Sequence, residues 1–278
     1  MPRTESPLRY PGGKSKLYNT IKKLINDNFN KSECTYIEPF AGGAGLALKL
    51  LNNGDVERIV LNDIDEGIYS FWIACLLHTN ELCNLIQECE ISIDNWNIQR
   101  NIYRMKSGYT KLEIGFATFF LNRCNVSGVI QGGPIGGKTQ NGKYSIDARF
   151  NKNDLISKIQ AIGAQRDRIE IFNLDATNFL LNVVPNYTCN KVLLNIDPPY
   201  VKKGPMLYEN SFTEEDHVQL SNIIKMLDTK WIVTYDENQL IYDIYEEYRK
   251  NVISMNYSAG QTKKGQELII YSHEVIKE

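Results

Sequence analysis

YIEPFAGGAGLAL, residues 36–48, joins an apolar run, an acidic residue, a glycine-rich turn and a second apolar run. The first run predicts a buried strand, and the second predicts a helix over residues 44–53. Three glycines of the turn would let the backbone approach a ligand closely at the N-terminus of that helix: Gly42, Gly43 and Gly45. The same glycines also suit a tight turn without a ligand. A strand–turn–helix unit is typical of open α/β sheets, in which ligands bind at the carboxyl ends of the strands.

Short apolar runs alternate with helical patterns along much of the remaining chain. Strands are predicted at ERIVLNDID (57–65), RIEIFNLD (168–175), KVLLNIDPPY (191–200) and KWIVTYD (230–236). Helices are predicted over residues 213–227 and 237–248. This alternation predicts a doubly wound, mostly parallel α/β sheet. The last β-prone runs, NVISMNY and ELIIYS, predict a C-terminal hairpin that adds an antiparallel strand to that sheet.

The middle of the chain, residues 66–168, breaks this alternation and predicts an inserted, mainly helical unit. Between Arg100 and Arg168 the sequence has twelve Lys and Arg against four Asp and Glu, a net charge of +8, although the whole chain carries −2. A basic insert in an acidic body indicates a local contact surface for nucleic acid. The alternative is a set of solvated helix faces with scattered lysines. We therefore predict one domain from residues 1–65 and 169–278, and an insert at 66–168.

A glycine-rich segment, SGVIQGGPIGGKTQNGKYSIDARFN (127–151), lies within the insert. Turn-forming residues punctuate it, and short β-prone runs flank the turn, which predicts a long hairpin or loop. The alternative is a disordered surface loop.

Asp63 ends the strand pattern of IVLNDID, about twenty residues past the glycine turn. An acid at this place can accept both ribose hydroxyls of an adenosine-containing ligand. A dinucleotide-binding dehydrogenase would share the feature, but EPFAGGAG is not a G-x-G-x-x-G motif. The other alternative is that Asp63 caps the helix that follows it.

NIDPPY, residues 195–200, is the most specific motif of the chain. Its two prolines fix φ and remove two backbone donors, so that carbonyl oxygens remain available to a ligand. Asp197 adds a carboxylate acceptor and Tyr200 adds a flat aromatic surface. Acceptors beside a stacking surface suit a planar group with an exocyclic amine, whereas the alternative is a simple turn after a strand.

LRYPGGKSKL, residues 8–17, ends like a phosphate-binding P-loop at Gly13-Lys14-Ser15. A P-loop also needs a glycine five residues before its last glycine, and that position is Leu8. The spacing therefore excludes an ATPase of this class.

Composition limits the remaining possibilities. No apolar run is long enough to span a bilayer, and MPRTESPLRY lacks the pattern of a secretory signal. The six cysteines form no C-x-x-C pair, which predicts reduced thiols in a cytoplasmic protein without a metal site.

The motifs LRYPGGKSKL, YIEPFAGGAGLAL, LNDID, FFLNRCNVSG, NIDPPY and YENSF occur in an order that resembles Dam-type (class alpha) DNA adenine-N6 methyltransferases. The resemblance covers most of the chain. It implies a Rossmann-like S-adenosylmethionine-dependent methyltransferase sheet with a C-terminal antiparallel hairpin and an inserted helical target-recognition domain. The implied enzyme transfers a methyl group from S-adenosylmethionine to N6 of adenine in double-stranded DNA, without a metal or a covalent enzyme intermediate.

The resemblance also implies a set of cofactor contacts. Lys14 would bind the methionine carboxylate, Asp63 the ribose, and Asp175 the adenine amine unless it only caps a helix. The further residues implied at the cofactor are Tyr10, Glu38, Phe40, Ala41, Gly42, Gly43 and Asp197.

At the reacting base, the Asp197 carboxylate and the Pro198 carbonyl would accept hydrogen bonds from adenine N6 as that nitrogen becomes positive. Tyr200 would stack on the adenine once it is flipped out of the duplex. The side chains implied at DNA are Arg9, Arg123, Asn125, Ser127, Gln131 and Lys138. Gln131 stands where GATC-methylating relatives carry an arginine, so the resemblance does not predict GATC as the target.

Other classes remain open at this point. A cytosine-N4 methyltransferase would use the same physics, but serine usually replaces the acid of its motif. A protein-glutamine methyltransferase would carry Asn-Pro-Pro-Tyr and lack the basic insert. A non-catalytic DNA-binding or cofactor-sensing module should lack the acceptor that Asp197 supplies. The sequence also leaves open whether a cognate restriction endonuclease acts on the same site.

Overall fold

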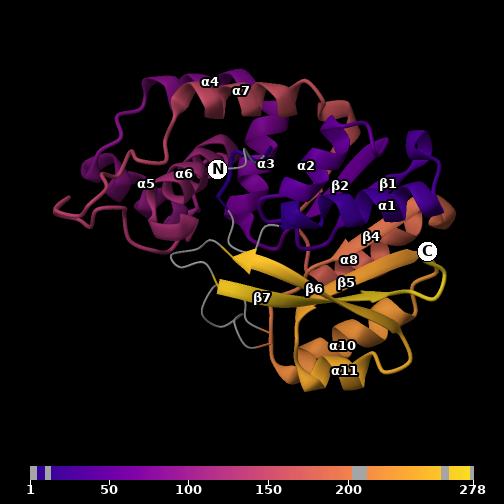
Figure 1. Ribbon diagram of the computed structural model, residues 1–278. Helices are drawn as coiled ribbons and strands as arrows, with labels where there is room; N and C mark the ends of the chain where they lie inside the picture. Colours follow the sequence, from indigo (N-terminus) through magenta and orange to yellow (C-terminus); the bar gives the residue numbers. More distant parts are fainter. Residues whose placement is uncertain (1–4, 10–13, 202–211, 258–262, 276–278) are drawn as a thin grey trace. The chain divides into compact units, whose positions relative to one another are not determined.

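The computed structural model describes residues 5–9, 14–201, 212–257 and 263–275 (Figure 1). The chain divides into two compact units. The helical unit comprises Met1–Gly13 and Asp63–Asn173, and the sheet unit comprises Lys14–Asn62 and Leu174–Glu278. The predicted boundaries at residues 65 and 169 stay predictions. In the structure, residues 63–65 and 169–173 belong to the helical unit and not to the sheet unit.

The sheet unit is a mixed sheet whose strands follow the order β2-β1-β4-β5-β7-β6 (Figure 1). Its strands are β1 (Thr35–Glu38), β2 (Arg58–Asn62), β4 (Val192–Ile196), β5 (Lys230–Asp236), β6 (Arg249–Tyr257) and β7 (Lys263–Tyr271). The neighbours from β2 to β5 pair in parallel, whereas β7 pairs antiparallel with both β5 and β6. This arrangement confirms the predicted α/β sheet with its C-terminal antiparallel hairpin.

Buried strands and amphipathic helices form the core of the sheet unit. Every residue of β1 and of β4 is buried, as expected for parallel strands with both faces covered. The helices are α1 (Tyr18–Asn28), α2 (Gly45–Asn52), α8 (Ala176–Asn182), α10 (Glu214–Lys225) and α11 (Gln239–Ile244). Single 3₁₀ turns lie at Lys14–Leu17, Lys31–Glu33, Val184–Asn186 and Cys189–Lys191. The helix predicted to begin at Thr213 begins at Glu214, because Thr213 is its N-cap.

The helical unit contains α3 (Glu66–Leu77), α4 (Thr79–Glu88), α5 (Ile93–Met105), α6 (Lys111–Cys124) and α7 (Lys152–Gly163). It also contains β3 (Ile169–Phe172) and 3₁₀ turns at Val126–Gly128 and Arg166–Arg168. Helices α4 and α7 lie side by side (Figure 1). Helix α6 is buried along most of its length, and Gly115 brings its backbone against Ser70 of α3, where a Cβ would lie 2.5 Å from the Ser70 carbonyl oxygen.

The glycine-rich segment is a series of turns and not a β-hairpin. Residues 129–151 are all described, and no strand lies among them; one isolated bridge joins Asn125 to Pro134. The Gln140 side chain donates to the carbonyls of Ile135 and Gly137 and accepts from the Ile146 amide. These side-chain bonds occupy backbone groups that a hairpin would pair with another strand, so of the predicted hairpin or loop the segment forms a loop.

Among the described helices, none is both long enough and apolar enough to cross a bilayer.

Candidate active site

Asp197 follows β4 directly, at the carboxyl end of a central parallel strand. Its Oδ1 atom accepts a hydrogen bond from Thr234 Oγ1 at 2.7 Å and pairs with Lys14 Nζ at 3.1 Å. Burial raises the pKa of Asp197, and the Lys14 ammonium opposes that shift. The carboxylate that the motif predicted as an acceptor is therefore held from two sides, and 27% of its side chain remains exposed.

Lys14 is buried among three oxygen acceptors. Its ammonium donates to Glu267 Oε1 at 2.9 Å and to the Tyr200 hydroxyl, in addition to its ion pair with Asp197. Tyr200 also donates to Glu267 Oε1, at 2.9 Å. Burial would lower the pKa of Lys14, but the charges of Asp197 and Glu267 outweigh it and raise the pKa. Because an ammonium has three N–H donors, these contacts occupy all of them.

Glu38 ends β1 and is fully buried in a polar network. The Tyr36 hydroxyl donates to Glu38 Oε1 at 3.0 Å, and the Asn195 side chain hydrogen-bonds to both residues. Burial raises the pKa of Glu38 to about 8, with a further contribution from the charge of Asp197. The Glu38 carboxyl therefore gains or loses its proton near pH 8 and not in the ordinary carboxyl range.

The glycine turn after β1 has an unusual backbone conformation. Gly42 has φ +46°, which glycine adopts without strain, and Ala44 has φ +44°, which is rare for a residue with a side chain. Asn62 supports the turn: its amide donates to the carbonyls of Pro39 and Leu174, both at 3.0 Å. The Asn62 backbone carbonyl accepts from the Ala41 amide at 2.9 Å. The buried side chain of Asn62 thus links the glycine turn to Leu174, just before α8.

Phe40 and Asp175, two of the predicted cofactor contacts, both belong to the sheet unit. The Phe40 ring packs edge-on against Phe212, with 6.0 Å between ring centroids. Asp175 is exposed and caps α8, because its Oδ1 accepts from the amides of Thr177 and Asn178. The cap that the sequence offered as an alternative is present, and it leaves the second carboxylate oxygen to other partners.

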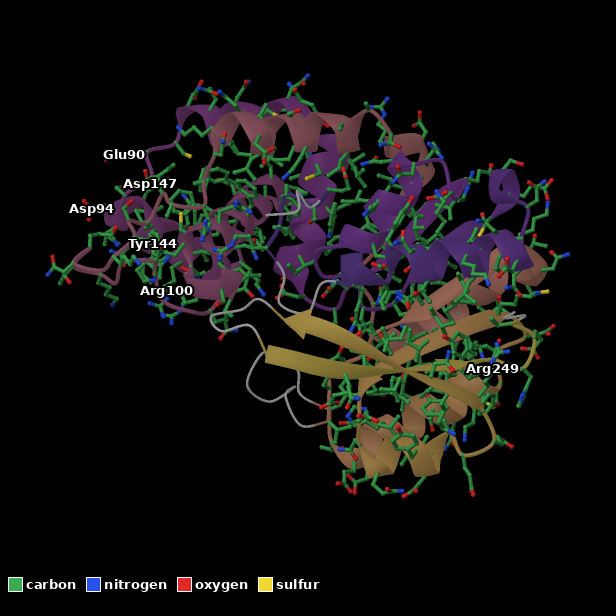
Figure 2. All side chains as sticks on the ribbon, in the orientation of Figure 1. Glu90, Asp94, Arg100, Tyr144, Asp147 and Arg249 are labelled. Atoms are coloured by element: carbon green, nitrogen blue, oxygen red, sulfur yellow. The ribbon has the colours of Figure 1, made fainter. Side chains whose placement is uncertain are left out.

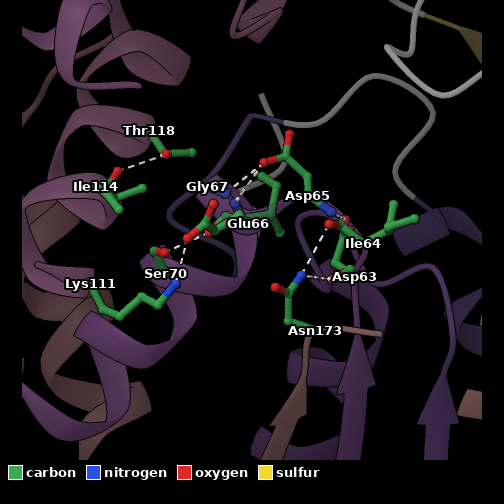
Figure 3. Close-up of polar contacts among 11 residues, drawn as sticks. Asp63, Ile64, Asp65, Glu66, Gly67, Ser70, Lys111, Ile114, Thr118 and Asn173 are labelled. Atoms are coloured by element: carbon green, nitrogen blue, oxygen red, sulfur yellow. Dashed lines mark hydrogen bonds and ion pairs between the residues drawn. The ribbon is translucent and has the colours of Figure 1, made fainter. Parts of the chain in front are cut away.

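Asp63 belongs to the helical unit (Figure 3). Its side chain is buried, and Oδ1 accepts from the Asp65 amide at 2.9 Å. Asn173 donates to the backbone carbonyls of Asp63 and Ile64. The helix-cap alternative falls on Asp65, whose carboxylate accepts from the first amides of α3.

The sequence profile of the D12 class N6 adenine-specific DNA methyltransferases matches residues 10–259. The chain belongs to this family. It is a DNA adenine-N6 methyltransferase, and its cofactor is S-adenosylmethionine.

Individual proteins resemble the chain at low identity. The type II methyltransferase M.CviBI of Paramecium bursaria Chlorella virus NC1A is 23% identical over 250 residues, which cover 87% of this chain and 86% of that protein. The type II methyltransferase M.MjaIII of Methanocaldococcus jannaschii is 23% identical and covers 80% of each chain. A solved structure, the rRNA methyltransferase aviRa of Streptomyces viridochromogenes, overlaps 96% of this chain and 88% of its own at 10% identity, with a TM-score of 0.42.

The residues around the glycine turn fit the cofactor of this family. A methionine moiety presents an ammonium and a carboxylate. The buried Glu38 carboxyl suits the ammonium, and the turn leading into α2 brings backbone amides to a helix N-terminus. Tyr10, the remaining predicted cofactor contact, lies outside the described residues.

Three of the predicted DNA contacts, Arg9, Arg123 and Asn125, lie together at the end of α6. Asn122 is fully buried, and its side chain bonds to the backbone of Arg9 at both the amide and the carbonyl, 2.7 and 2.8 Å away. Arg9 donates to the Asn125 carbonyl, and Arg123 donates to the carbonyls of Arg149 and Pro7. Burial lowers the pKa of Arg123 to about 10, and the charges of Arg9 and Arg149 add to that effect.

Asn125 has a structural position that the sequence did not predict. Its side chain is fully buried, accepts from Trp96 Nε1 at 2.7 Å, and donates to the carbonyls of Val129 and Ile130. Its polar atoms are occupied inside the protein, so the geometry argues against a direct DNA contact. By contrast, Ser127, Gln131 and Lys138 are exposed.

Sequence reasoning missed Thr234, Glu267 and Asn122. Thr234 and Glu267 lie within β-prone runs, where a polar residue carries no motif, and only the pairing of β5 with β7 brings them together. Asn122 lies within the motif FFLNRCNVSG, and this motif was the only sequence feature that could have indicated its importance. Among the described residues, no cluster of His, Cys, Asp or Glu could hold a metal ion.

Proposed function

We propose that the chain methylates N6 of an adenine that is flipped out of a short target sequence in duplex DNA, with Asp197, Pro198 and Tyr200 at the base. The observation that carries the proposal is the ion pair of Asp197 with the buried Lys14, at the first residue after β4. The ammonium stabilises the ionised carboxylate, which is the form that best stabilises a positive charge on an amine.

The protein's part in the reaction is to hold the amine and stabilise its developing charge. When bound, S-adenosylmethionine would supply an electrophilic methyl group on a sulfonium, whose S–C bond would break to leave a neutral thioether. The Asp197 carboxylate and the Pro198 carbonyl accept the two N6 hydrogens, which stabilises the positive charge that N6 gains as its lone pair attacks. After the N–C bond has formed, the N6 ammonium loses one proton, which the Asp197 carboxylate can accept. Tyr200 stacks on the flipped ring.

At the cofactor, Glu38 would bind the methionine ammonium and Asp175 the adenine amine, with Phe40, Ala41, Gly42 and Gly43 around the methionine and Asp63 at the ribose. Lys14 has a different role from the one the family resemblance implied. Because its three donors are occupied by Asp197, Glu267 and Tyr200, we assign it to Asp197 and not to the methionine carboxylate.

The helical unit would bind the DNA. Arg9, Arg123 and Arg149 concentrate positive charge at the end of α6, which suits phosphate contacts. The exposed Ser127, Gln131 and Lys138 would read base edges. Further positive charge comes from residues such as Arg100 (Figure 2), whose guanidinium lies over the Trp96 ring. Replacement of Arg123 by Ala is expected to weaken DNA binding and to leave cofactor affinity unchanged; a loss of cofactor affinity instead would remove Arg123 from the DNA surface.

The setting is a restriction–modification system in the cytoplasm. Two of the similar proteins are named as type II methyltransferases, which supports a role beside a cognate restriction endonuclease that cuts the same site. The six cysteines are free thiols, as expected in a reducing compartment.

The decisive experiment is methyl transfer from labelled S-adenosylmethionine to unmethylated genomic DNA, followed by sequencing that detects modified bases. N6-methyladenine at one short motif would support the proposal, and Asp197→Ala should abolish it while cofactor binding persists. N4-methylcytosine, or no incorporation by a protein that binds the cofactor, would contradict it.

A further inference from the structure

The two oxygens of the Asp197 carboxylate have different surroundings. Oδ1 takes both protein contacts, from Thr234 Oγ1 at 2.7 Å and from Lys14 Nζ at 3.1 Å. Oδ2 has no hydrogen-bond partner among the residues that the structure describes. Because Oδ1 is occupied by two donors, Oδ2 is the oxygen left for a substrate amine.

The donors to Oδ1 are themselves fixed by the antiparallel part of the sheet. Asp236 of β5 pairs with Glu267 of β7, and Thr234 pairs with Ile269. Side chains two residues apart on a strand share a face, so Thr234 and Glu267 are diagonal neighbours on one face of the β5–β7 pair. From that face Thr234 reaches Asp197, and Glu267 reaches Lys14 and Tyr200.

Stability alone does not account for Glu267. Its side chain is fully buried, and the paired ammonium of Lys14 is 5% exposed. A buried ion pair generally adds little or no stability compared with well-packed apolar residues, because both charges lose their hydration. Lys14 faces two carboxylates here, so this arrangement costs desolvation that an apolar residue on β7 would avoid.

We propose that Thr234 and Glu267 are positioning residues for methyl transfer: Thr234 and Lys14 hold Asp197 Oδ1 so that Oδ2 meets the adenine amine, and Glu267 keeps Lys14 and Tyr200 in place. This inference rests on the proposed adenine-N6 methylation. Neither residue touches the substrate, and each acts through a neighbour that does.

Thr234→Val and Thr234→Ser form the matched test. Thr234 is fully buried in a strand, and valine conserves its shape while removing the hydroxyl. A hydrogen bond to a charged group corresponds to roughly a 10- to 100-fold change in rate, so the single-turnover methylation rate of Thr234→Val should fall by that factor at saturating DNA and cofactor. The cofactor Kd should stay within about twofold, and serine should restore most of the rate.

The pH profile is a second readout that a merely structural role would not move. Asp197 stabilises a positive charge on N6 best when it is ionised. Burial raises the pKa of Asp197, and the hydrogen bond from the Thr234 hydroxyl lowers it. The acid limb of the rate should therefore shift to higher pH in Thr234→Val and return in Thr234→Ser. The other titratable groups that face Asp197 are Lys14, Glu267, Glu38, Tyr36 and Tyr235.

Glu267→Gln and Glu267→Leu test the other half. Glutamine keeps an oxygen that accepts from Lys14 and Tyr200, whereas leucine removes it. We expect Glu267→Leu to lose at least tenfold in rate and Glu267→Gln to retain more activity than leucine, with cofactor affinity unchanged in both. Wild-type rates and pH profiles in Thr234→Val and Glu267→Leu would overturn the inference, as would equal losses in rate and cofactor affinity. If the wild-type chain itself forms no N6-methyladenine, the proposed function fails instead.

Discussion

Asn125 is the residue of the helical unit at which a DNA contact and a structural role predict the most different results. Its side chain is fully buried at the end of α6 and makes three hydrogen bonds: one from Trp96 Nε1 and two to the carbonyls of Val129 and Ile130. Replacement of Asn125 by Ala removes all three at once. The side chain therefore fixes the start of the glycine-rich loop against α5.

The cost can be estimated from these partners. Trp96 is fully buried, so its indole N–H would be left without water, at about 2 kcal/mol. Val129 and Ile130 are half-buried, so their carbonyls regain water, at roughly 0.5 to 1 kcal/mol each. The free energy of unfolding should fall by about 3 to 4 kcal/mol, which corresponds to a Tm lower by roughly 10 °C.

The assay is calorimetric unfolding of Asn125→Ala beside Gln131→Ala. Gln131 is exposed, three residues beyond the end of the 3₁₀ turn at Gly128, so its truncation should change stability by less than about 0.5 kcal/mol. Trp96→Phe removes the same indole donor, and the double variant should show coupling of about 1 to 2 kcal/mol with Asn125→Ala. Wild-type stability of Asn125→Ala, together with weaker DNA binding, would refute the structural role and restore the residue as a DNA contact.

Three further changes test other parts of the chain. Glu38, with a pKa raised to about 8 by burial, keeps its proton in the folded state while the unfolded carboxyl has lost it. The native state therefore holds more protons than the unfolded state between the ordinary carboxyl range and pH 8. The free energy of unfolding falls as pH rises through that window, by at most about 1.4 kcal/mol per pH unit. In urea titrations Glu38→Gln should reduce this fall, and the same pH dependence in wild type and variant would contradict the raised pKa of Glu38. Gly115→Ala forces a Cβ to within 2.5 Å of the Ser70 carbonyl oxygen and should destabilise by about 1 to 3 kcal/mol, whereas Gly133→Ala, with no atom within 4 Å of its Cβ, should not. Asp175→Asn should keep the α8 cap and the unfolding midpoint while weakening cofactor binding severalfold, and unchanged affinity would leave Asp175 as a cap only.

The sequence alone determined the sheet class and the place of its motifs. Apolar runs, turn residues and helix caps are local signals, because each depends on backbone preferences within a few residues. They placed Glu38 and Asp197 at strand ends, and the antiparallel hairpin after β5. They did not decide between a hairpin and a loop for the glycine-rich segment, where the side chain of Gln140 donates to the backbone carbonyls of Ile135 and Gly137.

Only the tertiary structure decided which side chains meet. Lys14 pairs with Asp197 and Glu267, and Asn125 is buried against Trp96, although no local pattern links these positions. Such contacts depend on strand register and on how helices pack, and both are set by long-range burial of apolar surface. A lysine after a glycine pair and an asparagine after a helix look like ligand contacts in a sequence. Inside the fold, the lysine pairs with Asp197 and Glu267, and the asparagine holds a loop.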